Sequence, residues 1–172
     1  MNVKVILFSF AFVICFLTQN KAQQTARVIR VKDGDTYVLQ TGNRSFTVRL
    51  KKIDAPEIKQ NGGYGAYQFV SSLINGKIDE YDSTGKDKYG RVLVSAKLNG
   101  LRLDSLIIIN GWAWHYVNFD NELMLDIIMQ EAIRDRLGLW KCGIDKVCPP
   151  WLWRGYNSRS RAKYCKGCKS IY

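Results

Sequence analysis

The sequence predicts an α+β protein, mainly β in its first half, and three observations carry that prediction. Apolar and polar residues alternate in short segments between residues 27 and 50 and again over 91–98, the period of half-buried strands. Apolar residues recur at helical spacing over 66–74 and 121–137. A chain of 172 residues, 47% of them hydrophobic, is long enough for one domain with a substantial core.

The first three strands are expected at 27–32, 35–41 and 44–50. Asp33-Gly34 separates the first two, and Gly42-Asn43 supplies a tight turn before the third. The three strands therefore predict an antiparallel meander.

Strands and helices then mix. The remaining elements are expected as a helix over 66–74, a strand over 77–81, a polar turn over 82–87, a strand over 91–98, a hairpin into 101–103, a short helix over 104–109 and a long helix over 121–137. Asp104 is the expected N-cap of the short helix, and Gly138 the expected C-cap residue of the long one.

The first 22 residues have the pattern of a secretory signal peptide. Lys4 precedes an apolar run over 5–17, and Ala22 is the expected cleavage position. The run is shorter than the roughly 20 residues needed to span a bilayer. We therefore expect an exported protein, secreted or periplasmic, with no membrane insertion after the signal is removed.

Four cysteines remain beyond the leader, at positions 142, 148, 165 and 168. An even number in an exported protein favours two disulfides, and the spacing leaves all three pairings open. A zinc site is the alternative, because Cys165-x2-Cys168 with Cys142 and Cys148 offers four thiols.

Charge is the strongest compositional signal. The chain has 26 basic and 15 acidic residues, a formal net charge of +11, which favours a polyanionic partner. Residues 144–172 form a basic, aromatic extension with no acid after Lys146. Truncation after Lys146 is expected to weaken nucleic-acid binding and to flatten its salt dependence.

Residues 49–57 carry the first chemical suggestion. The strand that contains Arg49 must end near Ala55, because Pro56 lacks an N–H and restricts its predecessor. Asp54 and Glu57 then lie at the rim of the sheet, close to an arginine. Two carboxylates beside a guanidinium predict a site for a metal ion and a phosphate.

Four segments in order resemble the staphylococcal nuclease-like (thermonuclease) family over roughly residues 26–141. They are VKDGDT at 31–36, VRLKKIDAPE at 48–57, DKYGR at 87–91, and the end of the long helix from Glu131-Ala132 to Gly138-Leu139-Trp140. The resemblance implies a five-stranded OB-type β-barrel packed by three helices, occupying residues 23–143. OB barrels commonly bind single-stranded nucleic acid on one face.

The resemblance also implies a catalytic site. Asp35, Asp54 and the carbonyl of Ala55 match the family's calcium ligands, an oxygen donor set that suits this hard cation. Arg49 and Arg91 match the arginines that bind the phosphate and neutralise charge in the transition state. Glu57 matches the proposed general base.

Four further residues match substrate-binding positions. Lys88 and Tyr89 match positions near the terminal phosphate of a bound nucleotide. Trp114 and Tyr116 fall where the family has two tyrosines, and Trp114 is expected to stack on a base.

These matches predict an exported, calcium-dependent nuclease that hydrolyses DNA and RNA with little sequence specificity and leaves 3′-phosphate ends. We expect a monomer with no stable protein partner. A non-catalytic OB-fold nucleic-acid-binding protein is the main alternative, and a surface adhesion protein that uses the basic extension is the second.

Overall fold

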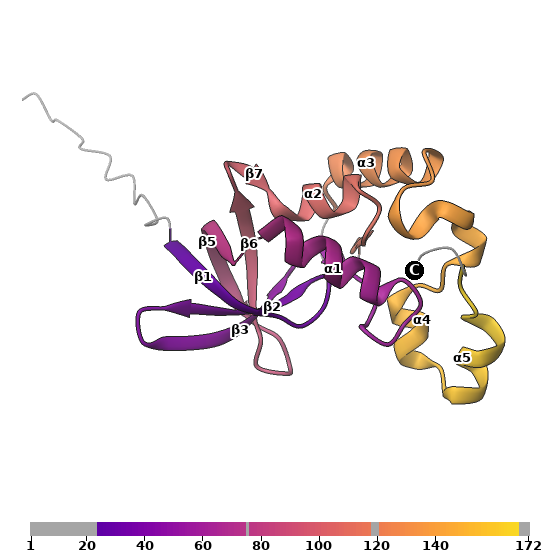
Figure 1. Ribbon diagram of the computed structural model, residues 1–172, viewed down its shortest axis with the longest axis horizontal. Coiled ribbons are helices and arrows are strands. Elements are labelled where there is room, and N and C mark those ends of the chain that lie inside the picture. Colours follow the sequence, from indigo (N-terminus) through magenta and orange to yellow (C-terminus); the bar gives the residue numbers. More distant parts are fainter. Residues whose placement is uncertain (1–23, 75, 118–120, 169–172) are drawn as a thin grey trace, which may run out of the picture.

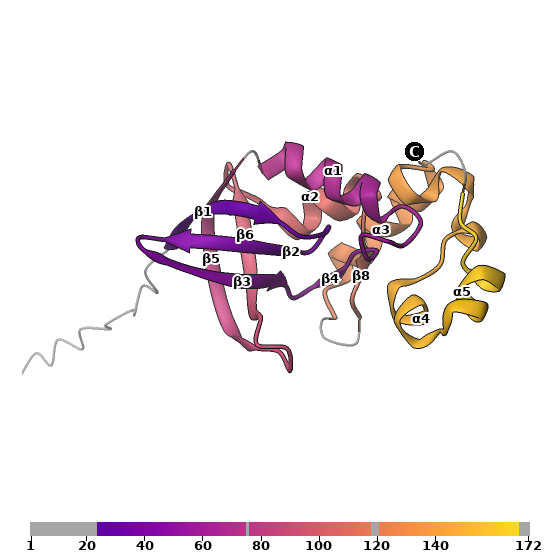
Figure 2. The same cartoon turned by 60° about the horizontal axis from the view of Figure 1, so that its bottom comes forward.

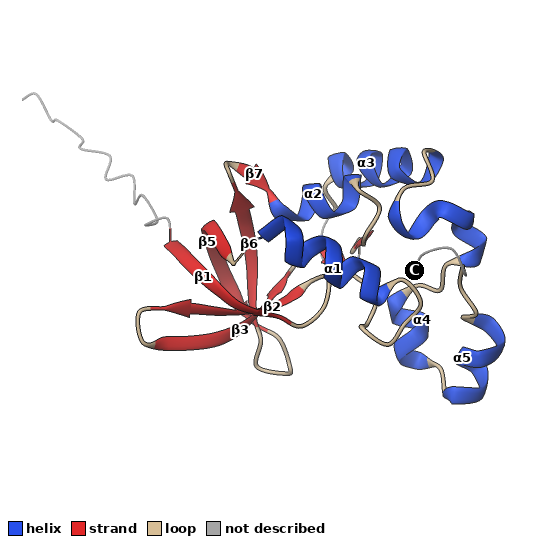
Figure 3. Ribbon diagram, in the orientation of Figure 1, coloured by secondary structure: helices blue, strands red, loops and turns tan. Residues whose placement is uncertain are grey.

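A computed structural model describes residues 24–74, 76–117 and 121–168. Strands gather at one end of the molecule and helices at the other (Figures 1 and 3). The expected signal peptide lies outside the described residues. Among the described residues, no helix has both the length and the apolar character needed to cross a bilayer.

Five strands close into a barrel with mixed strand directions. In the main sheet the strands are β1 (Gln24–Val31), β2 (Thr36–Thr41), β3 (Arg44–Leu50), β5 (Lys77–Lys86), β6 (Val92–Leu98) and the short β7 (Leu101–Arg102), in the spatial order β3-β2-β1-β5-β6-β7. Antiparallel pairs link neighbours along this order, and a parallel pairing of β3 with β6 closes the ring. The predicted α+β fold with a five-stranded barrel is therefore confirmed.

The pairing of β3 with β6, which closes the barrel, determines which side chains lie at the barrel rim. In β3, Arg49 is paired with Thr36 of β2 on one side and with Leu93 of β6 on the other. Arg91 directly precedes β6. Barrel closure thus brings Thr36, Arg49 and Arg91 together, although the sequence separates them.

Helices cover the barrel because each presents an apolar face to it. Helix α1 (Gly63–Ile74) buries Ala66, Val70 and Ile74, which are four residues apart and share one face. Helix α2 (Leu103–Ile109) buries Leu103, Ile107 and Ile108. Helix α3 (Leu123–Arg134) packs on α2 and buries Leu125 and Ala132.

A second, two-stranded sheet stands between the barrel and the C-terminal helices. Strand β4 (Ile53–Asp54) pairs antiparallel with β8 (Trp114–His115), with Asp54 opposite Trp114. In Figure 2 this small sheet lies between the barrel strands and helix α4. It places Asp54 where residues of the extension can reach it.

The extension is compact and cross-linked. After two 3₁₀ turns, η1 (Gly138–Cys142) and η2 (Ile144–Lys146), come helices α4 (Pro150–Gly155) and α5 (Ser158–Tyr164). Disulfides join Cys142 to Cys168 and Cys148 to Cys165. Two disulfides are confirmed over the zinc alternative, and the structure selects the pairing that the spacing left open.

Four local predictions are wrong. The strand that contains Arg49 does not run to Ala55: β3 ends at Leu50, and Ile53–Asp54 form the separate strand β4. The polar residues 82–87 form no turn, because β5 continues to Lys86 in register with β6 through an irregularity at Ser83–Gly85. Asp104 is not an N-cap: it lies inside α2, whose N-cap is Arg102, and it pairs with that arginine. Gly138 does not cap α3, which ends at Arg134 with Asp135 as its C-cap residue, but begins η1.

Candidate active site

The turn at 33–35 positions the first carboxylate. Asp33 accepts a hydrogen bond from the backbone N–H of Asp35 at 3.0 Å, the local turn typical of aspartate. Gly34 is required by close packing, because a Cβ there would lie 2.7 Å from the Cβ of Ala55. The missing side chain lets the 33–35 turn lie directly against the segment that carries Ala55.

Asp35 and Asp54 converge on one arginine. Arg49 Nη2 lies 2.9 Å from Asp54 Oδ1 and 3.3 Å from Asp35 Oδ2. The backbone N–H of Ala55 donates to Asp35 Oδ2 at 3.0 Å, which ties the two carboxylate segments together. The Arg49 and Asp54 side chains are only 9% and 0% exposed, so their charges are compensated inside the protein.

Arg91 reaches the same network through a threonine. Its Nη1 donates to Thr36 Oγ1 at 3.2 Å, and Thr36 donates to Asp35 Oδ1 at 2.8 Å. On its other side, Arg91 Nε pairs with Asp87 at 2.8 Å. This contact sets the direction of the guanidinium, so Arg91 is held at the rim next to Asp35.

Glu57 is held on a tight loop. Its N–H donates to the side chain of Gln60 at 3.2 Å, and its carbonyl accepts from the N–H of Gln60 at 2.7 Å. Gly63 allows the loop to close, since a Cβ there would lie 1.9 Å from the Glu57 carbonyl oxygen. The Glu57 side chain is partly exposed and near Asp54, a suitable place for a group that handles water.

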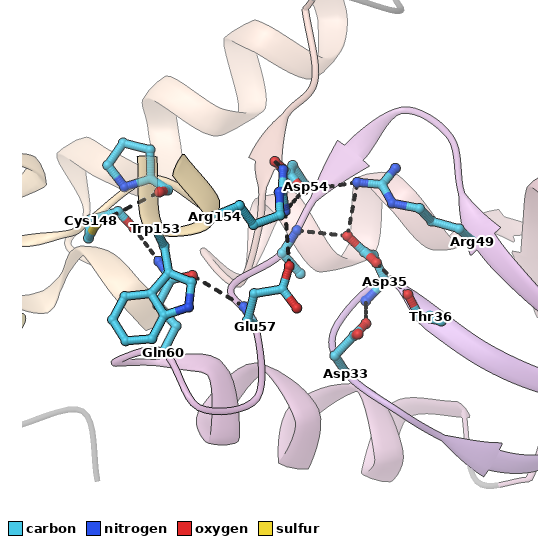
Figure 4. A network of polar contacts seen from close by, with 12 residues as sticks. Asp33, Asp35, Thr36, Arg49, Asp54, Glu57, Gln60, Cys148, Trp153 and Arg154 are labelled. Carbon is cyan, nitrogen blue, oxygen red and sulfur yellow. Dashed lines mark hydrogen bonds and ion pairs between the residues drawn. The ribbon is translucent and has the colours of Figure 1, made fainter. Parts of the chain in front are cut away.

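An arginine from the extension enters the site from the opposite side. Arg154, in α4, donates to Asp54 through two nitrogens, at 2.7 and 3.1 Å, and to Glu57 Oε1 at 3.1 Å. Figure 4 shows Asp54 between Arg49 and Arg154, with Glu57 below. Asp54 is thus shared by one arginine of the barrel and one of the extension.

The pKa values in the site reflect burial opposed by ion pairing. Burial and the neighbouring Asp35 carboxylate raise the pKa of Asp33 to about 7. Burial raises the pKa of Asp54, and the hydrogen bonds from Arg154 offset part of that rise. For Arg49, burial lowers the pKa but the carboxylates of Asp35 and Asp54 more than compensate, so the net shift is upward.

The donor set suits a weakly bound hard cation. Asp35 and Asp54 approach each other closely enough to share Arg49, and the Ala55 carbonyl is adjacent in sequence. Within the described part of the chain, no three or more His, Cys, Asp or Glu side chains are clustered to hold a metal. Two carboxylates, a carbonyl and waters would fit calcium, whose ligands are all oxygens.

Lys88 and Tyr89 lie in the loop between β5 and β6. Both are exposed, and the Arg91 guanidinium lies 5.5 Å from the Tyr89 ring. Asp87 shapes the loop by accepting from the N–H groups of Tyr89 and Arg91. The two side chains are therefore available to a ligand at the Arg91 side of the site.

Trp114 and Tyr116 differ sharply in surroundings. Tyr116 packs beside the site, with the Arg49 guanidinium 5.5 Å from its ring. Trp114 is only 6% exposed and packs edge-on against Trp140 at 4.8 Å and Trp151 at 6.2 Å. The expected stacking of Trp114 on a base conflicts with this burial, because its ring has little free surface.

Three residues of the network were not predicted. Thr36 lies inside the DGDT segment, but nothing in the sequence showed that its hydroxyl joins Arg91 to Asp35. Gln60, almost fully buried, bonds both Glu57 and the carbonyl of Cys148. Arg154 was one basic residue among several in the extension, and only the basic, aromatic composition of residues 144–172 singled out that region.

Comparison with known proteins gives concordant matches. A family model described as staphylococcal nuclease homologue matches residues 47–142. An uncharacterized endonuclease of Escherichia coli is 33% identical over 154 residues, which cover 88% of this chain and 95% of that protein. One from Haemophilus influenzae is 30% identical over 141 residues, covering 81% and 79%. Staphylococcal-like nuclease CAN1 of Arabidopsis thaliana is 32% identical over 111 residues, which cover 64% of this chain and 34% of the plant protein.

Proposed function

Because the chain belongs to the staphylococcal nuclease family, we propose that it is an exported, calcium-dependent nuclease acting on DNA and RNA. It hydrolyses phosphodiester bonds with little sequence preference and leaves 3′-phosphate ends. The nuclease names of the relatives support the reaction class. The calcium dependence, the 3′-phosphate products and the export are parts of our proposal that these names do not state.

One observation carries the proposal. Three charged side chains, Asp35, Arg49 and Asp54, meet at the barrel rim. Arg91 joins this network through Thr36, and Glu57 joins it through Arg154. Solvated surface charges would not converge in this way. Buried ionic groups are costly unless paired, so such a cluster is typical of a functional site.

The two barrel arginines suit phosphoryl chemistry. Their planar guanidinium groups stay protonated and match phosphate oxygens, on which negative charge grows as water attacks phosphorus. Asp87 and the Asp35–Asp54 pair hold Arg91 and Arg49 in place before substrate arrives, so little reorganisation is needed. Glu57 orients or deprotonates the attacking water.

Calcium would be held by Asp35, Asp54 and the carbonyl of Ala55, and when bound it supplies further positive charge at the phosphate. Few protein carboxylates are available, so the affinity is weak and suits a calcium-rich environment outside the cell. The two disulfides support such an environment, because they persist under oxidising conditions.

The contacts available to substrate favour broad specificity. Lys88, Tyr89 and Tyr116 flank the arginines and can bind phosphate or stack on a base. None of these interactions reads base edges. A cationic surface of this kind binds the nucleic-acid backbone, and its affinity falls as salt rises.

Incubation of the purified protein with plasmid and single-stranded DNA, in calcium or in chelator, tests the proposal. We expect cleavage in calcium only, with fragments that a polymerase extends only after phosphatase treatment. Glu57→Gln should cleave at least about 100-fold more slowly, while Glu131→Gln on α3, a matched change away from the site, should cleave normally. Intact DNA in calcium with a folded protein would refute the enzyme assignment.

A further inference from the structure

Arg154 contacts the carboxylates of the proposed active site, although no sequence motif predicted these contacts. Two of its nitrogens donate to the two oxygens of Asp54, and the nitrogen at Asp54 Oδ1 also donates to Glu57 (Figure 4). Such two-pronged, charge-assisted pairs are among the stronger hydrogen bonds in proteins. Arg154 lies 100 residues after Asp54, so only the docked extension brings them together.

The extension is fixed against the site by several independent contacts. The Gln60 side chain donates to the carbonyl of Cys148, whose disulfide to Cys165 encloses the helix that bears Arg154. Trp151 packs edge-on against Trp114 of the small sheet. Arg154 is therefore presented to Asp54 by a cross-linked and docked segment.

We propose that Arg154 is a positioning residue of the active site, which holds Asp54 and Glu57 and must release Asp54 when calcium binds. The disulfide-tied extension thereby sets the calcium affinity of the site. This inference depends on the proposed function, because it takes Asp54 to be a calcium ligand.

The physical reason is competition between cations for one carboxylate. Asp54 Oδ1 accepts from both Arg49 and Arg154, and Oδ2 accepts from Arg154. A guanidinium stays charged, so it both occupies the oxygens that calcium needs and repels the ion. Calcium binding therefore has to displace one of the two arginines.

Exposure identifies the arginine that leaves. The Arg49 side chain is 9% exposed and also pairs with Asp35, whereas that of Arg154 is 40% exposed and faces Asp54 from outside the barrel. Removing Arg49 would leave two buried carboxylates with less compensation, a costly change. Arg154 can move into solvent and remain close to Glu57, its second partner.

Calcium titration of the purified, oxidised protein by calorimetry tests the inference. Arg154→Met keeps a long side chain without charge and should bind calcium about tenfold more tightly, because two charge-assisted hydrogen bonds no longer have to break. Arg154→Lys keeps the charge but loses the planar guanidinium group, so its calcium affinity should lie between those of wild type and Arg154→Met. Arg159→Met removes the same charge from an exposed position in α5 and should match wild type.

The outcomes separate this inference from the proposed function. Equal calcium affinity in wild type and Arg154→Met, weaker affinity in the variant, or no binding by either would overturn the inference, provided that thermal unfolding shows both folded. Cleavage of plasmid in calcium is scored separately on the same samples. If wild type cleaves plasmid but its calcium titration curve superimposes on that of Arg154→Met, the inference fails and the nuclease assignment stands. If wild type does not cleave plasmid, the nuclease assignment fails even if the two proteins differ in calcium affinity.

Discussion

The barrel and the extension hold their parts of the site by different means. The barrel side chains Asp35, Arg49 and Asp54 stand on a core of fully buried residues such as Tyr37 and Val48. In the described part of the extension, the buried residues are Cys148, Pro150, Cys165 and Cys168, three of which are disulfide cysteines. Packing fixes one half of the site, and covalent cross-links fix the other.

This difference suggests a division of roles. The groups proposed to act on phosphate come from the packed barrel, where their geometry is set before substrate binds. Arg154 comes from the docked extension outside the barrel core, and its partly exposed side chain can turn into solvent without disturbing that core. A position that has to yield to a metal ion is better placed on such a segment than within a barrel strand.

The largest expected effect is the difference in kcat between replacing an arginine of the barrel and replacing an arginine of the extension. Arg91→Gln should lower kcat by on the order of 100-fold or more, because it removes a positioned donor to the developing charge. Arg159→Gln, which removes an equal charge from the extension, should leave kcat nearly unchanged. Steady-state kinetics in saturating calcium measure both, and equal losses would contradict the division of roles.

A second prediction concerns the cross-link itself. Replacing Cys148 and Cys165 together by serine should loosen the extension by about 3 kcal/mol, the amount expected for closing a loop of this size. Amides of α4 and α5 should then exchange faster with solvent, while those of β2 and β3 keep their protection. Hydrogen exchange followed by mass spectrometry resolves the two regions. A parallel loss of protection in the barrel would show that both halves unfold as one unit.

The smallest expected effect is on stability, and it concerns the ion pairs that Glu122 makes outside the extension. Hydrogen bonds from Arg102 and Lys52 lower the pKa of Glu122 to about 2, from an ordinary 4.5. The stabilisation is therefore complete above pH 4.5 and is lost as pH falls through 2. Glu122→Gln should reduce the free energy of unfolding by about 1 kcal/mol at pH 7, since the pair is partly exposed.

Urea unfolding at several pH values checks this prediction. The difference between wild type and Glu122→Gln should shrink steadily between pH 4.5 and pH 2. A difference that stays constant over this interval would mean that the glutamine loses packing and not charge.

Much of the barrel could be predicted because strand patterns and turns are local. Residues 44–50 form β3 with the expected bounds, and the alternation that predicted β6 reflects its half-buried position. β5 was cut short because its polar second half resembles a turn; its pairing with β6 extends it, a tertiary effect that local composition does not encode.

The site could be predicted only as far as a motif reached. Asp54 and Glu57 stood out because they flank Pro56, which ends the strand of Asp54, and the family resemblance supplied Asp35 and Arg91. Arg154 could not be predicted, since its role depends on a disulfide pairing and a docking geometry that spacing leaves open. Trp114 shows the limit of a motif match: a position that matches a binding residue is buried against Trp140 and Trp151.

A crystal structure of the oxidised protein grown with calcium tests the central claim most directly. We predict an anomalous peak within about 2.3–2.6 Å of oxygens from Asp35 and Asp54, with Arg49 still paired to them and the Arg154 guanidinium withdrawn from Asp54. A calcium ion bound elsewhere, or one bound at Asp54 while Arg154 keeps both hydrogen bonds, would contradict the account.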